Sequence, residues 1–110
     1  MRMLLVGAGA VGESILRILK ERDKSSNWLE LVVVSDYDLE RAKEVCDNLG
    51  DYDRFKPEFV DAKSKESMKE LVKKYNLDFV MDATAPFLSN YIFDAAFEAG
   101  VNYGNMGTWS

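Results

Sequence analysis

The chain has 110 residues, enough for one domain with a single hydrophobic core. Its composition, 47% hydrophobic and 30% charged, is typical of a globular protein and excludes a disordered one. The net charge of −5 argues against nucleic acid or an anionic membrane as a partner, and the lack of histidine removes the commonest general base and metal ligand.

The first element expected is a strand over Met3–Val6, followed directly by the sequence GAGAVG. In a strand-to-helix turn of this kind, Gly7 allows the sharp turn, Gly9 leaves room for a pyrophosphate, and Gly12 lets the helix pack closely against the strand. The N–H groups and the positive end of the helix dipole then face the phosphates. A glycine-rich turn inside a core is the alternative. The residues assigned to this pyrophosphate site are Gly7, Gly9, Ala10, Val11 and Gly12.

A helix is expected over about Val11–Arg22, because apolar residues recur there at helical spacing. The side chains expected on its apolar face are Val11, Ile15, Ile18 and Leu19. The polar run Asp23–Asn27 ends the helix. Four consecutive apolar residues, Leu31–Val34, then predict a strand buried on both faces, as parallel strands are.

Asp36 follows this second strand, close to the spacing of about 20 residues at which an acidic side chain meets the adenosine ribose. A carboxylate there accepts hydrogen bonds from both ribose hydroxyls and repels a 2′-phosphate, and Tyr37 stands where an arginine would indicate NADP. Asp36 and Tyr37 are therefore assigned to the cofactor site and predict NAD, with NADP as the alternative. Arg41 keeps that alternative open, because it could turn toward a phosphate. Helix capping, the other role for this acidic pair, is assigned to Asp38.

The second helix is expected to run to about Leu49 and to end at Gly50. Cys46, the only cysteine, excludes an intrachain disulfide and a cysteine cluster for zinc, and no metal site is predicted. We expect it to be a small core residue beside Ala42, Val45 and Leu49.

The segment Asp51–Lys56 is expected to be a polar loop with two partly buried aromatic residues, followed by a short strand over Phe59–Val60. Asp61 and Ala62 are assigned to the adenine end of the cofactor, although capping of a turn is an equal alternative for Asp61. A third helix is predicted from apolar residues at helical spacing, namely Met68, Leu71, Val72 and Tyr75.

A fourth strand is expected over Leu77–Met81, with Asp82 capping the turn after it. In a doubly wound sheet this strand lies beside the first one, so the loop that follows forms the other wall of the cofactor crevice. Its small residues would let the nicotinamide ribose approach, and the Thr84 hydroxyl could hydrogen-bond to it. A plain turn into a helix that starts at Pro86 is the alternative. The residues assigned to this wall are Ala83, Thr84, Ala85 and Pro86.

A fourth helix closed by Gly100 and a fifth strand over Val101–Tyr103 complete the pattern. The apolar residues expected to line that helix are Leu88, Ile92, Ala95, Ala96 and Ala99. Alternating strands and helices with right-handed crossovers predict an α/β fold, a doubly wound parallel Rossmann sheet in the order 3-2-1-4-5 within three layers. Residues 1–104 are expected to form an NAD(P)-binding domain, and residues 105–110, with the large apolar Trp109, to begin a linker to a substrate domain outside this chain.

A signal peptide is disfavoured, because glycines interrupt the first apolar run and charged residues follow it. The sequence also contains no apolar run near the roughly 20 residues that a membrane span requires. We therefore expect a cytoplasmic protein.

Four blocks of the sequence resemble the N-terminal NAD(P)-binding domain of the saccharopine dehydrogenase family: MLLVGAGAVGESI, VVVSDYDLERAKEV, VDAKSKESMKELVKKY and DATAPFLSNYIFDAAFEAGVNYGNMG. The resemblance implies a nicotinamide-dependent oxidoreductase acting at the C–N bond of an amino acid of the saccharopine or lysine type. It places the pyrophosphate on Gly7–Gly12, the adenosine ribose on Asp36, the adenine near Asp61–Ala62 and the nicotinamide side at Ala83–Pro86.

The substrate domain and most catalytic groups of that family follow this domain, so no catalytic residue is named and the chain alone is expected to be inactive. The family's usual Tyr followed by an acidic or hydroxyl residue is replaced here by Tyr103-Gly104-Asn105. The resemblance implies a small amino-acid substrate and a homo-oligomeric parent that pairs through its second domain, with this chain alone monomeric.

Two other functions compete with this one. A regulatory nucleotide sensor, such as the Rossmann modules of potassium uptake systems, shares the glycine motif and the acidic residue, but does not require the DATAPFLS turn or the apolar tail. A fold that has lost its ligand and only mediates assembly would not require Asp36 and all three glycines.

Overall fold

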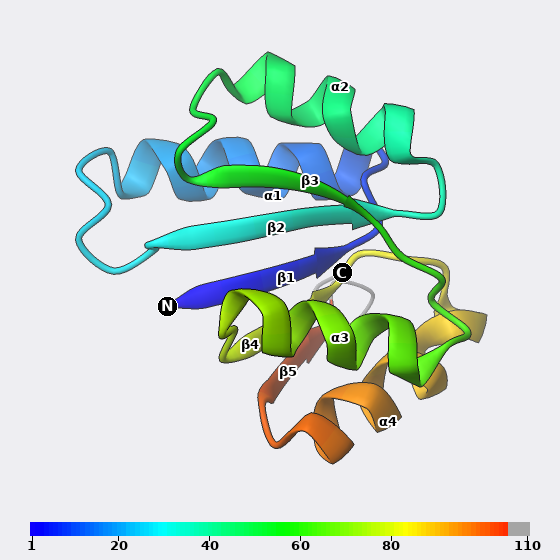
Figure 1. Ribbon diagram of the computed structural model, residues 1–110. Helices are drawn as coiled ribbons and strands as arrows, with labels where there is room; N and C mark the ends of the chain where they lie inside the picture. Colours follow the sequence, from blue (N-terminus) through cyan, green and yellow to red (C-terminus); the bar gives the residue numbers. More distant parts are fainter. Residues whose placement is uncertain (106–110) are drawn as a thin grey trace.

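The computed structural model describes residues 1–105, in which five strands alternate with helices (Figure 1). Their bounds are β1 (Arg2–Val6), α1 (Ala10–Arg22), β2 (Leu31–Asp36), α2 (Leu39–Leu49), β3 (Phe55–Phe59), α3 (Lys65–Tyr75), β4 (Phe79–Asp82), the 3-10 helix η1 (Pro86–Leu88), α4 (Ser89–Ala99) and β5 (Asn102–Asn105). The strands form one parallel sheet in the order β3-β2-β1-β4-β5. The Rossmann fold and strand order predicted from the sequence are confirmed.

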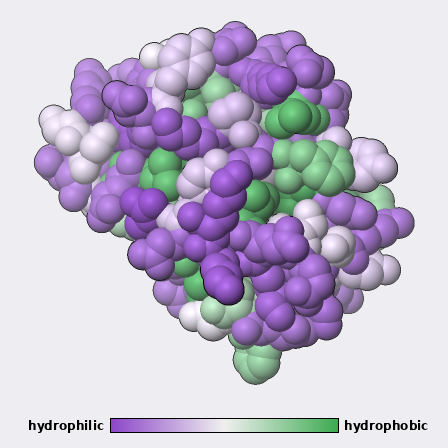
Figure 2. Space-filling view, viewed as in Figure 1, coloured by the Kyte–Doolittle hydropathy of each residue, from purple (hydrophilic) through white to green (hydrophobic). Residues whose placement is uncertain are grey.

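The sheet lies between two helical layers, with α1 and α2 on one face and α3 and α4 on the other (Figure 1). Successive strand residues point to opposite faces, so Met3 and Leu5 pack toward α1 and α2, whereas Leu4 and Val6 pack toward α3 and α4. The run Leu31–Val34 is buried throughout, as its composition predicts. Figure 2 shows that the face seen in Figure 1 is largely hydrophilic, with hydrophobic residues gathered in a band across its middle.

Strand β1 lies between β2 and β4, which fixes where the functional loops meet. Its last residue, Val6, is aligned with Ser35 on one side and with Asp82 on the other. The carboxyl ends of parallel strands share one edge of the sheet, so the segments that follow β1, β2 and β4 come together there.

Several local predictions for the second and fourth helices are confirmed. The carboxylate of Asp38 accepts the N–H of Arg41 and caps α2, and Gly50 and Gly100 end α2 and α4 in left-handed conformations. Cys46 is buried among the predicted core residues, and burial raises the pKa of its thiol to about 11.

In residues 1–105, the helices are too short and too polar to cross a membrane.

The predicted apolar face of α1 is partly wrong. The buried residues are Gly12 and Leu16, whereas Val11 and Ile18 are 58% and 52% exposed. The reason is the close approach of Gly12 to the loop after β1, where a Cβ would lie only 2.3 Å from the carbonyl oxygen of Gly7. The helix therefore touches the sheet along the line of Gly12 and Leu16 and turns Val11 and Ile18 toward solvent.

The third strand is longer and begins earlier than expected. Residues 55–56, predicted as loop, belong to β3, and Phe55 is completely buried. Because β3 is an edge strand that pairs only with β2, Pro57 is tolerated there despite its missing N–H. Strand β3 therefore owes its place to its pairing with β2 more than to its own composition.

The fourth and fifth strands begin later than the apolar pattern suggests. The N–H of Leu77 donates to the carbonyl of Val72 and the N–H of Val101 to that of Ala96, so both residues complete the ends of the preceding helices. Pairing then extends to Asp82 and Asn105. The linker was expected over 105–110, but Asn105 is the last residue of β5. Residues 106–110, with the predicted apolar tail at Trp109, lie outside the described residues, and a linker there stays a prediction.

Two charged residues that were expected in polar loops, Asp23 and Arg54, are each only 3% exposed. The Asp23 carboxylate accepts three backbone N–H bonds of 2.7–3.0 Å from residues 27–29. The Arg54 guanidinium donates to the carbonyl oxygen of Asp23 at 2.6 Å and pairs with Asp51 at 3.2 Å. Together these two side chains hold the segment that connects α1 and β2 against the residue before β3.

We expect Asp23→Asn to lower the thermal unfolding midpoint at pH 7 by about 5–10 °C. Burial by itself would raise the pKa of the Asp23 carboxyl, but the three N–H donors stabilise its charged form more strongly and lower that pKa. The stabilisation is therefore complete above the ordinary value of 3.8 and is lost as the pH falls through the lower folded value. The difference in unfolding midpoint between the variant and the wild type, followed by circular dichroism, should close as the pH falls below about 3.8. Asp53→Asn is the control: its carboxylate is exposed, so its midpoint should equal that of the wild type. A difference of constant size from pH 7 to pH 3 would contradict this.

Candidate functional site

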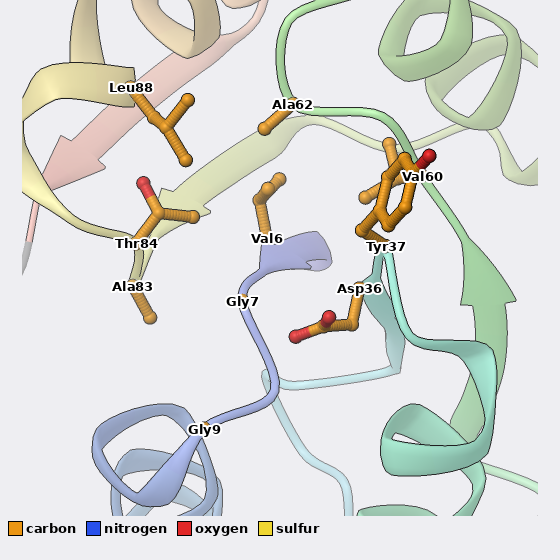
Figure 3. A pocket seen from close by; sticks show the side chains of 10 residues that line it. All are labelled: Val6, Gly7, Gly9, Asp36, Tyr37, Val60, Ala62, Ala83, Thr84 and Leu88. Atoms are coloured by element: carbon orange, nitrogen blue, oxygen red, sulfur yellow. The ribbon is translucent and has the colours of Figure 1, made fainter.

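A cavity of about 260 Å³ opens at the carboxyl edge of the sheet, where the strand order reverses at β1 (Figure 3). Its lining comes from the ends of strands and the segments that follow them: Val6, Gly7 and Gly9 at and after the end of β1, Asp36 and Tyr37 at and after the end of β2, Val60 and Ala62 after β3, and Ala83, Thr84 and Leu88 after β4. In an open α/β sheet, this reversal point is where ligands bind.

The three glycines of the GAGAVG sequence are present for different structural reasons. Gly7 has a φ of +105°, and a Cβ there would lie 2.8 Å from the carbonyl oxygen of Ala83. Gly12 would place a Cβ against the Gly7 carbonyl, so the fold itself requires glycine at both positions. Gly9 has an ordinary φ of −77°, and a Cβ on it would meet nothing within 4 Å. The fold therefore has no need of glycine at this position, and the space above Gly9 is open.

Gly9 is also the residue before α1, and no side chain caps that helix. The first N–H groups of a helix have no partner inside it and carry the positive end of the helix dipole. The open space over Gly9 thus adjoins a helix N-terminus that favours an anionic group.

The Asp36 side chain is held between this loop and the start of α2. One carboxylate oxygen accepts the N–H of Ala8 at 2.7 Å, and the other accepts the N–H of Asp38 at 2.8 Å. Figure 3 shows the carboxylate pointing into the cavity beside the glycine loop. Each oxygen has a second lone pair, so the carboxylate can still accept bonds from two ligand hydroxyls.

An aromatic and apolar side of the cavity lies beyond Asp36. The Tyr37 ring, 72% exposed, lies 5.4 Å from that of Phe59, centre to centre. Val60 and Ala62 border the same side of the cavity (Figure 3). Such a surface suits a flat heterocyclic base better than a charged group.

The opposite wall is formed by the loop after β4. The N–H of Ala83 donates to the carbonyl of Val6 at 2.9 Å, which holds this loop against the end of β1. The Thr84 hydroxyl donates to Asp82 at 2.6 Å. Because the Thr84 hydroxyl proton is engaged by Asp82, the Thr84 oxygen can only accept a hydrogen bond from a ribose hydroxyl.

Seven of the predicted site residues line the cavity, namely Gly7, Gly9, Asp36, Tyr37, Ala62, Ala83 and Thr84. Six others lie outside its lining: Ala10, Val11 and Gly12 in the first turn of α1, Asp61 in the turn after β3, and Ala85 and Pro86 at the start of η1. Asp61 accepts the N–H of Lys63 at 3.0 Å, which is the turn role considered as its alternative. For these six, contact with a cofactor stays a prediction.

Three lining residues, Val6, Val60 and Leu88, were not expected in the site. All are apolar residues next to strand or helix ends, and composition assigns such residues to the core. The only signal for them was position, since Val6 and Val60 end predicted strands at the functional edge of the sheet.

The Arg41 side chain is paired with two carboxylates. Its guanidinium donates to Glu13 at 3.0 Å and also pairs with Glu44. Glu13 accepts further bonds from Asn48 at 3.0 Å and from Arg17 at 2.9 Å, and these donors, Asn48 first, lower the pKa of its carboxyl. No lysine or arginine in the described part of the chain lines the cavity.

A second groove, of about 430 Å³, lies beside α1 and β4 and is lined by apolar residues such as Met3, Ile18, Trp28 and Phe79. Arg22 is the only charged residue in its lining, so few polar groups are available to orient a nucleotide. Within residues 1–105, no group of three or more acidic or cysteine side chains could hold a metal ion. The cavity at the strand ends is therefore the candidate site.

Comparison with known proteins identifies a family for this chain. The family model described as the saccharopine dehydrogenase NADP binding domain matches residues 3–108. A search of curated protein sequences gives no match.

Among solved structures, the apo saccharopine dehydrogenase (L-Glu forming) of Saccharomyces cerevisiae matches with a TM-score of 0.74 and 15% identity, over 94% of this chain and 21% of that one. A GalE-like L-threonine dehydrogenase from Cupriavidus necator matches with a TM-score of 0.65 and 18% identity, over 92% and 34%. The L-threonine 3-dehydrogenase of Trypanosoma brucei matches with a TM-score of 0.65 and 18% identity, over 94% and 35%. At these identities the likeness shows the fold, and the chain spans about a fifth to a third of those proteins.

Proposed function

Because the chain belongs to the saccharopine dehydrogenase NADP-binding domain family, we propose that it binds the nicotinamide dinucleotide of an oxidoreductase that acts at the C–N bond of an amino acid. The observation that carries the proposal is Gly9, a glycine that the fold does not require, beside open space at a helix N-terminus. A bound pyrophosphate explains that glycine, because its oxygens need close access to the backbone.

The residues of the cavity fit such a cofactor from one end to the other. Gly9 and the first turn of α1 would face the pyrophosphate, and the Asp36 carboxylate would accept the ribose hydroxyls. Tyr37 and Ala62 would flank the adenine, and the loop from Ala83 would face the nicotinamide half. The cofactor supplies the hydride chemistry, and this chain binds and orients it.

The substrate end of the reaction is assigned to another part of a longer protein. The lining contains one carboxylate, Asp36, which is committed to backbone N–H groups and the ribose, and the Tyr37 phenol lies at the adenine side. We therefore assign the amino-acid substrate, of the saccharopine or lysine type, and the catalytic acid and base to a domain after residue 105 of a cytoplasmic homo-oligomer. The coding sequence after Ser110 tests this: a further domain is expected, and a stop codon would contradict it.

For the choice between the two dinucleotides, the family description names NADP, whereas the geometry at Asp36 favours NAD. A 2′-phosphate would lie against the Asp36 carboxylate, and Arg41 is engaged by Glu13 and Glu44. Arginine or another cation is what usually accommodates that phosphate. We therefore propose NAD as the preferred cofactor.

Titration of the chain with NADH, NADPH and ADP-ribose tests the proposed function. Binding of NADH and ADP-ribose is expected, with a weaker affinity for NADPH, followed by calorimetry or by energy transfer from Trp28 to the reduced nicotinamide. Adenosine, which lacks the phosphates, is the control and should bind much more weakly. Absence of binding by all three nucleotides at millimolar concentration would overturn the proposal.

The role of Arg41 gives a separate prediction. Glu13→Ala removes one of its two carboxylate partners, and we expect the affinity for NADPH relative to NADH to rise about fivefold as the guanidinium becomes able to reach a 2′-phosphate. Glu40→Ala is the matched control, since it removes the same charge from the exposed side of α2, where Glu40 pairs with Lys43. An equal rise in both variants would contradict a specific role for Arg41.

A further inference from the structure

Asp82, the last residue of β4, is a carboxylate with only 1% of its surface exposed. One oxygen accepts both the N–H of Thr84 at 2.9 Å and its hydroxyl at 2.6 Å. The other oxygen accepts the hydroxyl of Tyr103 at 2.9 Å. A buried carboxylate destabilises the fold unless it is fully hydrogen-bonded. Two of these bonds come from Thr84 in the loop beside the cavity and the third from Tyr103 in β5, so Asp82 links the loop to β5.

Tyr103 is itself held in place from three sides. Its hydroxyl accepts from the side-chain amide of Asn105 at 2.9 Å, and that amide also donates to the Ser89 hydroxyl at the start of α4. The Phe93 ring meets the Tyr103 ring edge-on, with centres 5.3 Å apart. Burial and the nearby Asp82 carboxylate raise the pKa of Tyr103, which keeps its hydroxyl protonated and able to donate.

The other end of this chain of contacts reaches the cavity wall. Thr84 lines the cavity, and its methyl group would lie 3.1 Å from a Cβ on Gly7. The carbonyl oxygen of Ala83 would lie 2.8 Å from the same Cβ. The position of residues 83–84 is therefore determined on one side by the glycine loop and on the other by Asp82 and Tyr103.

We propose that Asp82 and Tyr103 are positioning residues that fix the loop 83–84 for the nicotinamide half of the dinucleotide. The inference rests on the proposed function and extends it from residues that line the cavity to residues behind its wall. Tyr103 and Asp82 do not line the cavity, and they act through Thr84. The adenosine half, on the far side of the glycine loop, does not depend on them.

Tyr103→Phe tests this, because it keeps the ring that packs on Phe93 and removes the hydroxyl, which donates to Asp82 and accepts from Asn105. The affinity for NADH should fall about tenfold, whereas the affinity for ADP, which lacks both the nicotinamide and its ribose, should stay within about twofold. Thr84→Val keeps the methyl group in the cavity and removes the hydroxyl that points to Asp82, so it should give the same selective loss. Both ligands are titrated into the 110-residue chain by calorimetry.

Tyr75→Phe is the matched control, since it removes a tyrosine bond to the Glu58 carboxylate, neither residue lines the cavity, and it should change neither affinity. Equal losses of affinity for NADH and ADP in Tyr103→Phe, or no loss of either, would overturn the positioning role while the proposed function stands. A wild-type chain that binds neither ligand would overturn both. Thermal unfolding of each variant shows that the chain is folded under the conditions of the titration.

Discussion

A Gly9→Val variant is expected to remain folded and to lose affinity for NADH by about a hundredfold or more. The backbone at Gly9 has an ordinary φ, and a Cβ there meets no protein atom within 4 Å. The cost to stability should therefore be limited to a poorer N-cap of α1, about 1 kcal/mol. The branched side chain would instead occupy the space that a pyrophosphate needs beside the helix N-terminus.

Gly12→Ala provides the contrast, because its added Cβ would lie 2.3 Å from the backbone of Gly7. That variant should unfold at a much lower temperature even without a ligand. The pair separates a glycine required by packing from one required by binding. If Gly9→Val bound NADH as the wild type does, the pyrophosphate assignment would be wrong.

The sheet order could be predicted because its determinants are local. The run Leu31–Val34 identifies a strand buried on both faces, and the glycines that end α2 and α4 mark where the chain turns back toward the sheet. Right-handed crossovers then restrict the arrangement of five alternating units, and the glycine motif after the first strand favours the order of a dinucleotide-binding sheet. Asp36 came to the functional edge in the same way, since its position follows from the end of β2.

Contacts between distant segments could not be predicted. Arg54 is buried because it reaches the carbonyl of Asp23, 31 residues earlier, and a local pattern of charged residues indicates only a loop. Strand β3 exists because β2 offers it an edge, so its own composition gave the wrong boundaries. The orientation of the Thr84 hydroxyl depends on a carboxylate that is in turn held by Tyr103, 21 residues farther along.

Asp36→Ala is expected to lower the affinity for NADH about thirtyfold and that for NADPH less than about fivefold. Removing the carboxylate deletes the acceptor for both adenosine-ribose hydroxyls of NADH and for the single 3′-hydroxyl that NADPH keeps. For NADPH, however, the same change removes a negative charge beside the 2′-phosphate, and this gain offsets much of the loss. The selectivity for NADH over NADPH, measured by titration of both into one preparation, should therefore fall about sixfold or more.

The variant also leaves the N–H groups of Ala8 and Asp38 without their partner, which loosens the glycine loop for both cofactors alike. Only the difference between the two affinities therefore reports on the ribose. Asp38→Ala is the matched control: it removes the neighbouring carboxylate and the cap of α2, keeps Asp36, and should cost about 1 kcal/mol of stability with no change in selectivity. If Asp36→Ala lowered the affinities for NADH and NADPH equally, the role of Asp36 would be only to hold the glycine loop. The preference for NAD would then have to arise from other residues.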